Sequence, residues 1–538
     1  MVTTAEDDGF AAIWPRLFTR RNLLHAMSVG AGAAVAGSSG LLLSACTAGA
    51  PPQATNSSGG ALTVSLFNAF PSLDPLAGQF EATQSIANLW SERLYRVDPF
   101  PPRAQISPEL AKGMPVETSP GVYQVKLEAN RKFHNGEDLD ADDVVYTLNR
   151  IKDPAENIDL ARFFELFEEV RSIGRYEVEF KLSVPISLIV ERLSVFPVLS
   201  RSVPPEQLKL RPVGSGPYRV TSAVSEKSVR LEKFNEYKGP RDQTYEVLDI
   251  SIVEDGNARI SGLRTAKFDV IEQVPPTAYE SLKGDHGVKE AAVDSYRSTT
   301  LIFNCGKPPF SDARMRRAVC YAIDRDAITR TSFFGLAKPA WGGWIPEEHP
   351  EYVRPELVYK YAPTRARQLI REAGYGTDPV PIDFLIFNES YVISQQPIIE
   401  QNLRDAGFSP NMVPGGLGLY ARVPEGRFSA LLGYSDASTG SPDIDFLLRF
   451  HFYGPLPRQF AHWNAPALAR IERLLDEAIE MNDETQRRQR WSEVQDIVQD
   501  EVPIAALHRV KQLTAWRSTL SGYRALPGPG FLPDGVSG

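Results

Sequence analysis

Short apolar strand patterns alternate with amphipathic helix patterns from Ala61 to the end of the chain, and this alternation constrains the fold most. Apolar and polar residues alternate along residues 122–127 and 382–386, as they do in half-buried strands. Residues 364–373 have helical spacing and are followed by Gly374, and glycine commonly ends helices. The alternation therefore predicts α/β domains with mixed sheets.

Capping residues and late periodic segments locate further elements. Asp140 and Asp312 each precede a segment with one apolar face, so each aspartate is expected to cap a helix. Two more helices are expected at residues 465–481 and 483–500. The apolar residues 504–507 are expected to form a late strand.

Length and charge limit the kinds of protein that the chain can be. It has 538 residues, enough for two or three domains with sizeable cores. Hydrophobic residues make up 42% and charged residues 23% of it, which is typical of a soluble globular protein. Its formal net charge of −9 disfavours a nucleic acid partner, because phosphate binding needs a basic surface.

The N-terminal segment has the pattern of an export signal. Arg20-Arg21 precede residues 23–45, which contain no Lys, Arg, Asp or Glu. That length would suffice for an uncleaved membrane anchor, but the glycines and serines of residues 30–40 weaken both a helix and its transfer into lipid. The small residues before Cys46 resemble the lipobox of bacterial lipoproteins. We therefore expect a cleaved twin-arginine signal peptide and a lipid on Cys46.

The three cysteines have different expected fates. Cys46 begins a Pro-, Ser- and Gly-rich stretch, residues 46–60, that is typical of a flexible tether, and acyl chains on its thiol would hold the protein at the cell membrane. Cys305 and Cys320 could form a disulfide in an exported protein. We favour two separate buried thiols, because free cysteine is commonly buried. Neither alternative indicates a metal site.

Common catalytic motifs are missing from the sequence. It contains no GxxxxGK[ST] phosphate loop, no HExxH zinc helix and no GxSxG nucleophile turn. Residues 214–217 (GSGP) are expected to form a turn that enters a strand, because proline and an apolar run follow the glycines. The seven histidines are scattered singly. The sequence therefore does not indicate an enzyme or a bound cofactor.

A series of segments in a fixed order does carry a resemblance. The segments are residues 107–111 (SPELA), 131–146 (RKFHNGEDLDADDVVY), 213–218 (VGSGPY), 234–239 (FNEYKG), 303–312, 316–325 and 361–374. In this order they resemble solute-binding proteins of ABC importers, family 5, the dipeptide- and oligopeptide-binding type. The resemblance covers residues 61 to about 520. Turn and cap chemistry explains most of these residues, so they are expected to support the scaffold and not to contact a ligand.

The resemblance implies a two-lobed periplasmic-binding-protein fold, the Venus-flytrap fold, with mixed sheets and an extra subdomain in the first lobe. Ligand would bind in the interlobe cleft of a monomer, and the closed form would dock on a membrane permease driven by a separate ATPase. The protein would face the periplasm or the cell exterior. We expect the order signal peptide 1–45, tether 46–60, first lobe 61–85, extra subdomain 86–204, first lobe 205–292, second lobe 293–508 and a return to the first lobe at 509–538.

One acidic residue is the first candidate for ligand contact. In peptide-binding relatives, an aspartate after an aromatic strand end pairs with the ligand's amino group. Asp436 follows Tyr434 here, although the spacing departs from the Trp-x-x-Asp pattern of those relatives. Asp436 is therefore a candidate amine-binding residue with Tyr434 beside it, and a solvated loop acid is the alternative.

Four further residues are weaker candidates for the same site. Arg422 could bind a ligand carboxylate, or it could be a surface charge. Trp341 and Trp344 could stack on a ligand, or they could belong to a lobe core. Asn388 could exchange hydrogen bonds with a ligand in the cleft.

The expected ligand is a peptide or a peptide-sized solute. Members of this family also bind non-peptide ligands, namely nickel chelates, haem, opines and oligosaccharides, and these remain alternatives. A secreted enzyme on the same scaffold is the less favoured alternative.

Overall fold

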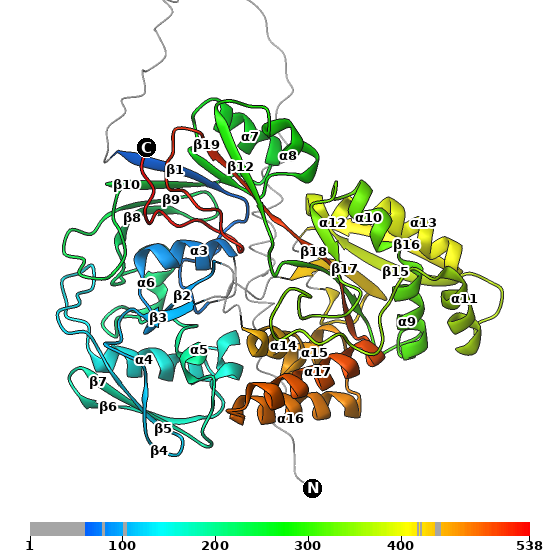
Figure 1. The fold of residues 1–538 in the computed structure, drawn as a ribbon, viewed down its shortest axis with the longest axis horizontal. Helices are drawn as coiled ribbons and strands as arrows, with labels where there is room; N and C mark the ends of the chain where they lie inside the picture. The colour runs from blue at the N-terminus through cyan, green and yellow to red at the C-terminus, as the bar shows by residue number, and fades with distance from the viewer. Residues whose placement is uncertain (1–59, 78–80, 101–104, 417–418, 420–421, 436–442) are drawn as a thin grey trace, which may run out of the picture.

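A computed structural model describes residues 60–77, 81–100, 105–416, 419, 422–435 and 443–538. The chain forms two halves that lie side by side (Figure 1), each built on a mixed sheet. Cys46 and the expected signal peptide lie outside the described residues, as does Asp436. None of the described helices is both long and apolar enough to cross a membrane.

The first sheet joins strands from distant parts of the chain. Its order is β12-β19-β11-β1-β10-β9-β8 within the described residues. The strands are β1 (Ala61–Leu66), β8 (Tyr218–Val224), β9 (Ser228–Lys233), β10 (Val247–Ile252), β11 (Val270–Glu272), β12 (Val288–Val293) and β19 (Gln512–Arg517). β1 runs parallel to β10 and β11, and the other neighbours are antiparallel. The parallel strands therefore end at the same edge of the sheet.

The second sheet has the order β14-β18-β13-β17-β15-β16 among the residues that the structure describes. Its strands are β13 (Ser298–Phe303), β14 (Ala337–Pro339), β15 (Val380–Phe387), β16 (Phe408–Gly415), β17 (Ala430–Ser435) and β18 (Ile504–Val510). β15 is parallel to both β16 and β17, so these three also end at one edge. The predicted α/β class with mixed sheets is confirmed.

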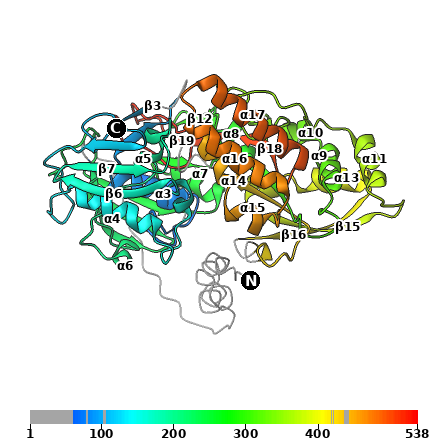
Figure 2. The same ribbon diagram turned by 90° about the horizontal axis from the view of Figure 1, so that it is seen from below.

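Two smaller sheets extend the first half. β4 (Val116–Ser119), β5 (Val122–Lys126), β7 (Glu177–Leu182) and β6 (Phe167–Gly174) form one of them, and β2 (Tyr95–Asp98) pairs with β3 (Gln105–Pro108). We call residues 86–204 the subdomain. Seen from below, β6, β7 and the helix α4 lie in the half opposite α9, α11 and α13 (Figure 2).

The helices of the first half are short to medium in length. They are α3 (Glu81–Trp90), α4 (Ala141–Lys152), α5 (Ile189–Leu193), α6 (Pro205–Leu208), α7 (Gly256–Arg264), α8 (Pro276–Leu282) and the 3₁₀ helix η2 (Asp159–Phe163). Asp140 caps α4, as predicted, and does so within a reciprocal capping box that includes Asp143. β8 begins at Tyr218 directly after the predicted GSGP turn.

The helices of the second half cover the second sheet and extend toward the subdomain (Figure 1). They are α9 (Ala313–Ala322), α10 (Arg325–Thr331), α11 (Pro363–Glu372), α12 (Ser390–Ile393), α13 (Gln396–Ala406), α14 (Ile444–Phe452), α15 (Pro455–Phe460), α16 (Pro466–Glu480) and α17 (Glu484–Glu501). Asp312 caps α9 through the Arg314 amide, and Gly374 follows α11 in the left-handed region at φ +90°. The predicted start of α9 and the predicted end of α11 are confirmed. Both depend on contacts within a few residues of the helix end.

The core of the second half contains one of the two remaining cysteines. Leu301, Phe303 and Phe384 lie fully buried between this sheet and the helices that cover it. Cys320 is buried with them, Cys305 is half-buried, and both thiols are free. The prediction of two separate thiols is confirmed, and the predicted burial holds for Cys320 but is only partial for Cys305. Burial raises the pKa of Cys320 to about 11, which keeps the thiol protonated and unreactive near neutral pH.

The chain crosses between the two main sheets at two described places. β12 leads into β13 through residues 294–297, and β18 leads into β19 through Lys511. Figure 1 shows both crossings on the same side of the molecule. Because these connections are short, a relative rotation of the two halves must pivot near them.

Candidate functional site

The carboxyl ends of the parallel strands bring polar residues together between the two sheets. β1 leads into Asn68, and β15 leads into Asn388 and Glu389. In open α/β sheets, ligands bind outside the carboxyl ends of the strands. The candidate site therefore lies at these strand ends and at the crossing connection beside them.

Arg297 links the two halves at this position. It ends the crossing that leads into β13, and its side chain is only 1% exposed. Its Nη2 donates to Glu81 Oε2 at 2.7 Å, and Glu81 begins α3 of the first half. Its Nη1 donates to the hydroxyl of Tyr391 in the second half at 3.3 Å. The guanidinium therefore bridges a carboxylate of one half and a phenol of the other.

Aromatic rings surround the second-half side of this bridge. The Tyr434 and Tyr391 rings lie 5.7 Å apart edge to face, and the Phe387 ring lies 5.6 Å from that of Tyr434. The Arg297 guanidinium lies 5.8 Å from the centre of the Tyr434 ring. A cation held near aromatic faces is stabilised by the ring quadrupoles. Asn68 completes the group, because its Nδ2 donates to Glu81 Oε2 at 2.8 Å.

We call Asn68, Glu81, Arg297, Glu389, Tyr391 and Tyr434 the strand-end cluster. Glu389 differs from the other members, because its carboxylate forms neither a hydrogen bond nor an ion pair with any residue that the structure describes. The pKa of Glu389 is raised to about 7. Burial is the main cause and the charges of Glu81 and Glu254 add to it, while Arg297 and Arg259 lower the pKa in part. A half-buried carboxylate has lost part of its hydration, so a nearby cation would stabilise its charged form.

Arg259 is not available to supply that cation. Its guanidinium donates to the backbone carbonyls of Val253 at 2.6 Å, Glu254 at 3.0 Å and Glu272 at 3.0 Å, among others. These carbonyls lie at or just beyond the ends of β10 and β11, and the residue is 2% exposed. Arg259 therefore fixes the strand ends that face the cluster.

The structure places two of the sequence-predicted candidates in or next to the strand-end cluster. Tyr434 belongs to it, at the penultimate position of β17. Asn388 lies immediately before Glu389, and its side chain is exposed. Its backbone N–H donates to the carbonyl of Gly415 at 2.9 Å. Asp436 lies outside the described residues, two positions after Tyr434.

The tryptophans occupy two different environments. Trp344 is 1% exposed, and its ring centre lies 3.9 Å from that of His451 in α14. His451 in turn bonds Ser435 at 2.6 Å, so Trp344 packs behind the end of β17 as core. Trp341 is half-buried, with the Lys360 ammonium 5.4 Å from its ring. Trp344 is therefore a residue of the lobe core, which is the second of the two alternatives considered from the sequence.

Arg422 is half-buried in the turn that leads toward β17. Its carbonyl accepts the amide of Arg427 at 3.0 Å, and the neighbouring Val423 packs with Phe428 and Leu431. Among the described residues, the Arg422 side chain forms no hydrogen bond or ion pair with the strand-end cluster.

Four members of the strand-end cluster were not candidates from the sequence: Asn68, Glu81, Arg297 and Tyr391. Glu389, a fifth, directly follows the candidate Asn388 in the sequence. A usable signal existed for Arg297, because it lies at the expected boundary between the first and second lobes. The described residues contain no group of three or more His, Cys, Asp or Glu side chains placed to hold a metal ion.

Comparison with known proteins fixes the family. Residues 105–454 match the family described as bacterial extracellular solute-binding proteins, family 5 Middle. The chain belongs to this family. Its members are extracytoplasmic solute-binding proteins of ABC importers, which are not enzymes.

Individual relatives of this family 5 chain have different ligands. The glutathione-binding protein GsiB of Shigella flexneri serotype 5b is 25% identical over 489 residues, covering 87% of this chain and 93% of the relative. A dipeptide-binding protein from Pseudoalteromonas sp. SM9913, solved with Met-Leu, has a TM-score of 0.79 and 20% identity, covering 88% of this chain and 99% of that one.

NikA from Staphylococcus aureus, solved with Ni(L-His)2, has a TM-score of 0.77 and 18% identity, covering 89% of this chain and 100% of that one. These structures confirm the predicted two-lobed fold of the periplasmic-binding-protein type. We accordingly call the half that contains the first sheet and residues 86–204 the first lobe, and the half that contains the second sheet the second lobe.

Proposed function

We propose that this solute-binding protein captures a peptide or peptide-sized solute that carries a free amino group, beside the strand-end cluster between the two lobes. Glu389 is the observation that supports this proposal most. Its carboxylate is half-buried and unpaired among the described residues, and burial raises its pKa to about 7. A ligand ammonium would supply the missing partner through a charge-assisted hydrogen bond.

The charges around Glu389 favour a cationic ligand group over an anionic one. Arg297 is paired with Glu81, and Arg259 is saturated by backbone carbonyls. The carboxylates of Glu389 and the exposed Glu254 remain on the two facing strand ends. Asp436, two positions after Tyr434 in the sequence, remains a proposed amine-binding residue as well. GsiB binds glutathione and the Pseudoalteromonas protein was solved with Met-Leu, both of which carry an amino group.

Ligand capture would work through closure of the two lobes. A solute that contacts both lobes only when they are together stabilises the closed state by the free energy of those added contacts. The closed protein would then deliver its solute, as a monomer, to a permease and its ATPase. The sheet topology agrees with the proposed boundaries for β13 to β17, within 293–508, and for β19, within 509–538, whereas β18 of the second sheet runs two residues past the boundary to Val510.

Export and anchoring belong to the same proposal. The twin-arginine signal of residues 1–45 would direct export, and lipid on Cys46 would hold the tether 46–60 at the membrane. A tethered receptor has a raised effective concentration near its permease. Cys46→Ser should release the protein from the membrane fraction into the soluble fraction. Retention of the Cys46→Ser variant on the membrane would contradict lipid anchoring and favour an uncleaved anchor.

A ligand panel tests the proposed solute class. Purified protein would be screened by thermal unfolding against glutathione, dipeptides, an opine, a nickel–histidine chelate and an oligosaccharide. Ligand that binds only the folded state stabilises it by RT ln(1 + [L]/Kd), which is about 2.7 kcal/mol at a hundredfold excess over Kd. Stabilisation by amine-bearing peptides supports the proposal, and stabilisation by the oligosaccharide alone refutes it.

The role of Glu389 needs its own variant. Glu389→Gln keeps the shape of the side chain and removes the charge, so an amine-bearing ligand should bind more weakly by about 1.5–3 kcal/mol. Glu206→Gln is the matched control, because Glu206 is an exposed acid of the first lobe with its side chain 83% accessible. Equal affinities of the two variants would remove Glu389 from the site.

A further inference from the structure

The two lobes also touch on the side of the molecule away from the crossing connections. There the subdomain meets the helices α14 and α16, while β12, β18 and β19 carry the crossings on the other side (Figure 1). A rotation about the crossings moves this remote contact the most. The contact must therefore separate whenever the lobes open.

An ion pair lies at the centre of this contact. Arg192 of α5 donates through Nη2 to Asp445 Oδ2 of α14, and the two side chains are 2% and 0% exposed. Arg449 also donates to Asp445 Oδ2 through Nε at 3.1 Å, and its Nη1 donates to Asp476 at 2.9 Å. Asp445 is thus already paired with Arg449 inside the second lobe, and Arg192 is the partner that the subdomain contributes.

Apolar and backbone contacts flank the ion pair. The rings of Phe163 and Phe446 stack with centres 4.2 Å apart and 7° between their planes. The Ser187 amide donates to the carbonyl of Ile479 at 2.7 Å, and the Ser187 hydroxyl donates to the same oxygen at 2.9 Å. We call this set of pairs, Arg192–Asp445, Phe163–Phe446 and Ser187–Ile479, the clasp.

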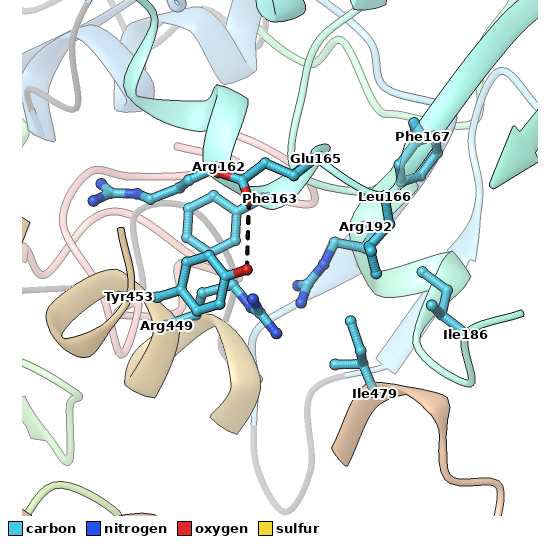
Figure 3. Close-up of a pocket in the computed structure, with 10 residues that line it drawn as sticks. All are labelled: Arg162, Phe163, Glu165, Leu166, Phe167, Ile186, Arg192, Arg449, Tyr453 and Ile479. Carbon is cyan, nitrogen blue, oxygen red and sulfur yellow. Dashed lines mark hydrogen bonds between the residues drawn. The ribbon is translucent and has the colours of Figure 1, made fainter. Parts of the chain in front are cut away.

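The clasp is closely packed. Figure 3 shows the guanidinium groups of Arg192 and Arg449 beside each other, with Ile479 below them and Tyr453 bonded to Glu165. The cavity that these residues line has a volume of about 10 Å³, room for roughly one water molecule. Two adjacent guanidinium groups repel each other unless an acid lies against both, and Asp445 Oδ2 accepts from both Arg192 and Arg449. The two surfaces therefore fit closely, with one carboxylate between two cations.

We propose that the clasp is a built-in closure device that holds the lobes together before any solute binds. When the lobes open, Arg192 and Asp445 regain hydration, which offsets much of the energy of their ion pair. The preference for the closed state therefore comes mainly from the stacked rings of Phe163 and Phe446 and from the hydrogen bonds of Ser187. Apparent affinity equals the intrinsic affinity multiplied by the fraction of molecules in the binding-competent state. The clasp thereby tunes solute affinity from a position outside the strand-end cluster.

The test uses the full chain without ligand, so its outcome is independent of the proposed peptide class. The protein is first freed of co-purified solute by dialysis under mild denaturant and refolding. Small-angle scattering then gives the radius of gyration, and hydrogen exchange follows the Ser187 amide, which the clasp protects. Arg192→Met removes the arriving charge and leaves Asp445 paired with Arg449.

Arg192→Met is expected to increase the radius of gyration and to speed exchange at Ser187 at least tenfold. Phe446→Leu tests the same contact without touching a charge and should act in the same direction. Arg150→Met is the matched control, since Arg150 pairs with Asp74 at 2.6 Å within the first-lobe half and both are buried. It should lower the melting temperature and leave the radius and the Ser187 protection unchanged.

The clasp is refuted by either of two results with folded variants. Equal radii and equal Ser187 exchange in the unaltered protein, Arg192→Met and Phe446→Leu would mean that the contact does not hold the lobes. An expanded, ligand-free unaltered protein would mean that the contact does not form before solute binds. Circular dichroism identifies any variant that has unfolded, and the remaining variant then decides.

Discussion

Glu92 should make the stability of the first lobe fall as pH rises. It follows α3, is fully buried and lies close enough to Glu109 for the two charges to interact. The pKa of Glu92 is raised from 4.5 to about 8, because burial and the charge of Glu109 outweigh the opposing effects of Arg131 and Arg241. The folded protein therefore holds this proton over a pH range in which the unfolded chain has released it.

The sign follows from proton linkage. Between pH 4.5 and pH 8 the folded state binds more protons at this site, so the free energy of unfolding decreases as pH increases. Each pH unit within this window costs about 1.4 kcal/mol, which amounts to roughly 3–5 kcal/mol across it. With an unfolding entropy of about 2.1 cal/mol/K per residue, a fold of this size should lose about 3–5 °C in melting temperature.

Glu92→Gln removes the titrating group and keeps the shape of the side chain. Melting temperatures should be measured by calorimetry at half-unit steps from pH 5 to pH 8.5. The unaltered protein should lose melting temperature along this series relative to Glu92→Gln, and the two should differ most at the alkaline end. Glu236→Gln, at an acid whose side chain is 62% exposed, should follow the unaltered protein. Parallel curves for all three proteins would refute the assignment of a buried, protonated Glu92.

Three further predictions concern the site and its supports. Glu389 has a pKa of about 7, so it takes up a proton between pH 7.5 and pH 6, and the affinity for an amine-bearing ligand should fall about eightfold over this range. Titration calorimetry measures this affinity, and Glu389→Gln should show no such fall. Asp140→Ala removes the cap of α4 and should cost about 0.5–2 kcal/mol in urea unfolding; an unchanged midpoint would contradict the capping role. Burial lowers the pKa of His451 to about 3, so the imidazole is neutral near pH 7. Its Nδ1 donates to the Leu447 carbonyl at 2.8 Å, and its unprotonated Nε2 therefore accepts a hydrogen bond from the Ser435 hydroxyl. His451→Phe should therefore cost about 1–3 kcal/mol, and addition of Ser435→Ala should recover part of that loss.

The sequence was sufficient where short-range chemistry decides the structure. Asp140 and Asp312 cap helices because their side chains reach amides two or three residues away. Gly407 ends α13 in the left-handed region, and the predicted strands at residues 122–127 and 382–386 appear as β5 and β15. Periodicity and capping are local properties, so one sequence is enough to recognise them.

The strand-end cluster could not be predicted in the same way. Arg297 and Glu81 are 216 positions apart, and no local pattern relates them. Trp341 and Trp344 look alike beside their glycines, yet α14 arrives from far along the chain to cover Trp344 with His451 and Phe452. Long-range packing therefore decides which aromatic residues remain available to a ligand.

The two interlobe contacts should respond differently to opening because of where they lie. Arg297 lies on a crossing connection, so a rotation about the crossings displaces it little, and its bonds to Glu81 and Tyr391 can persist while the lobes separate. Arg192 lies on the remote side, where the same rotation produces the largest displacement, so its bond to Asp445 must break. A substitution at Arg297 should then alter the site itself, whereas one at Arg192 should alter only the balance between open and closed lobes. Solute affinity would therefore depend on two separate arginines, one that shapes the ligand's surroundings and one that sets how often the lobes come together.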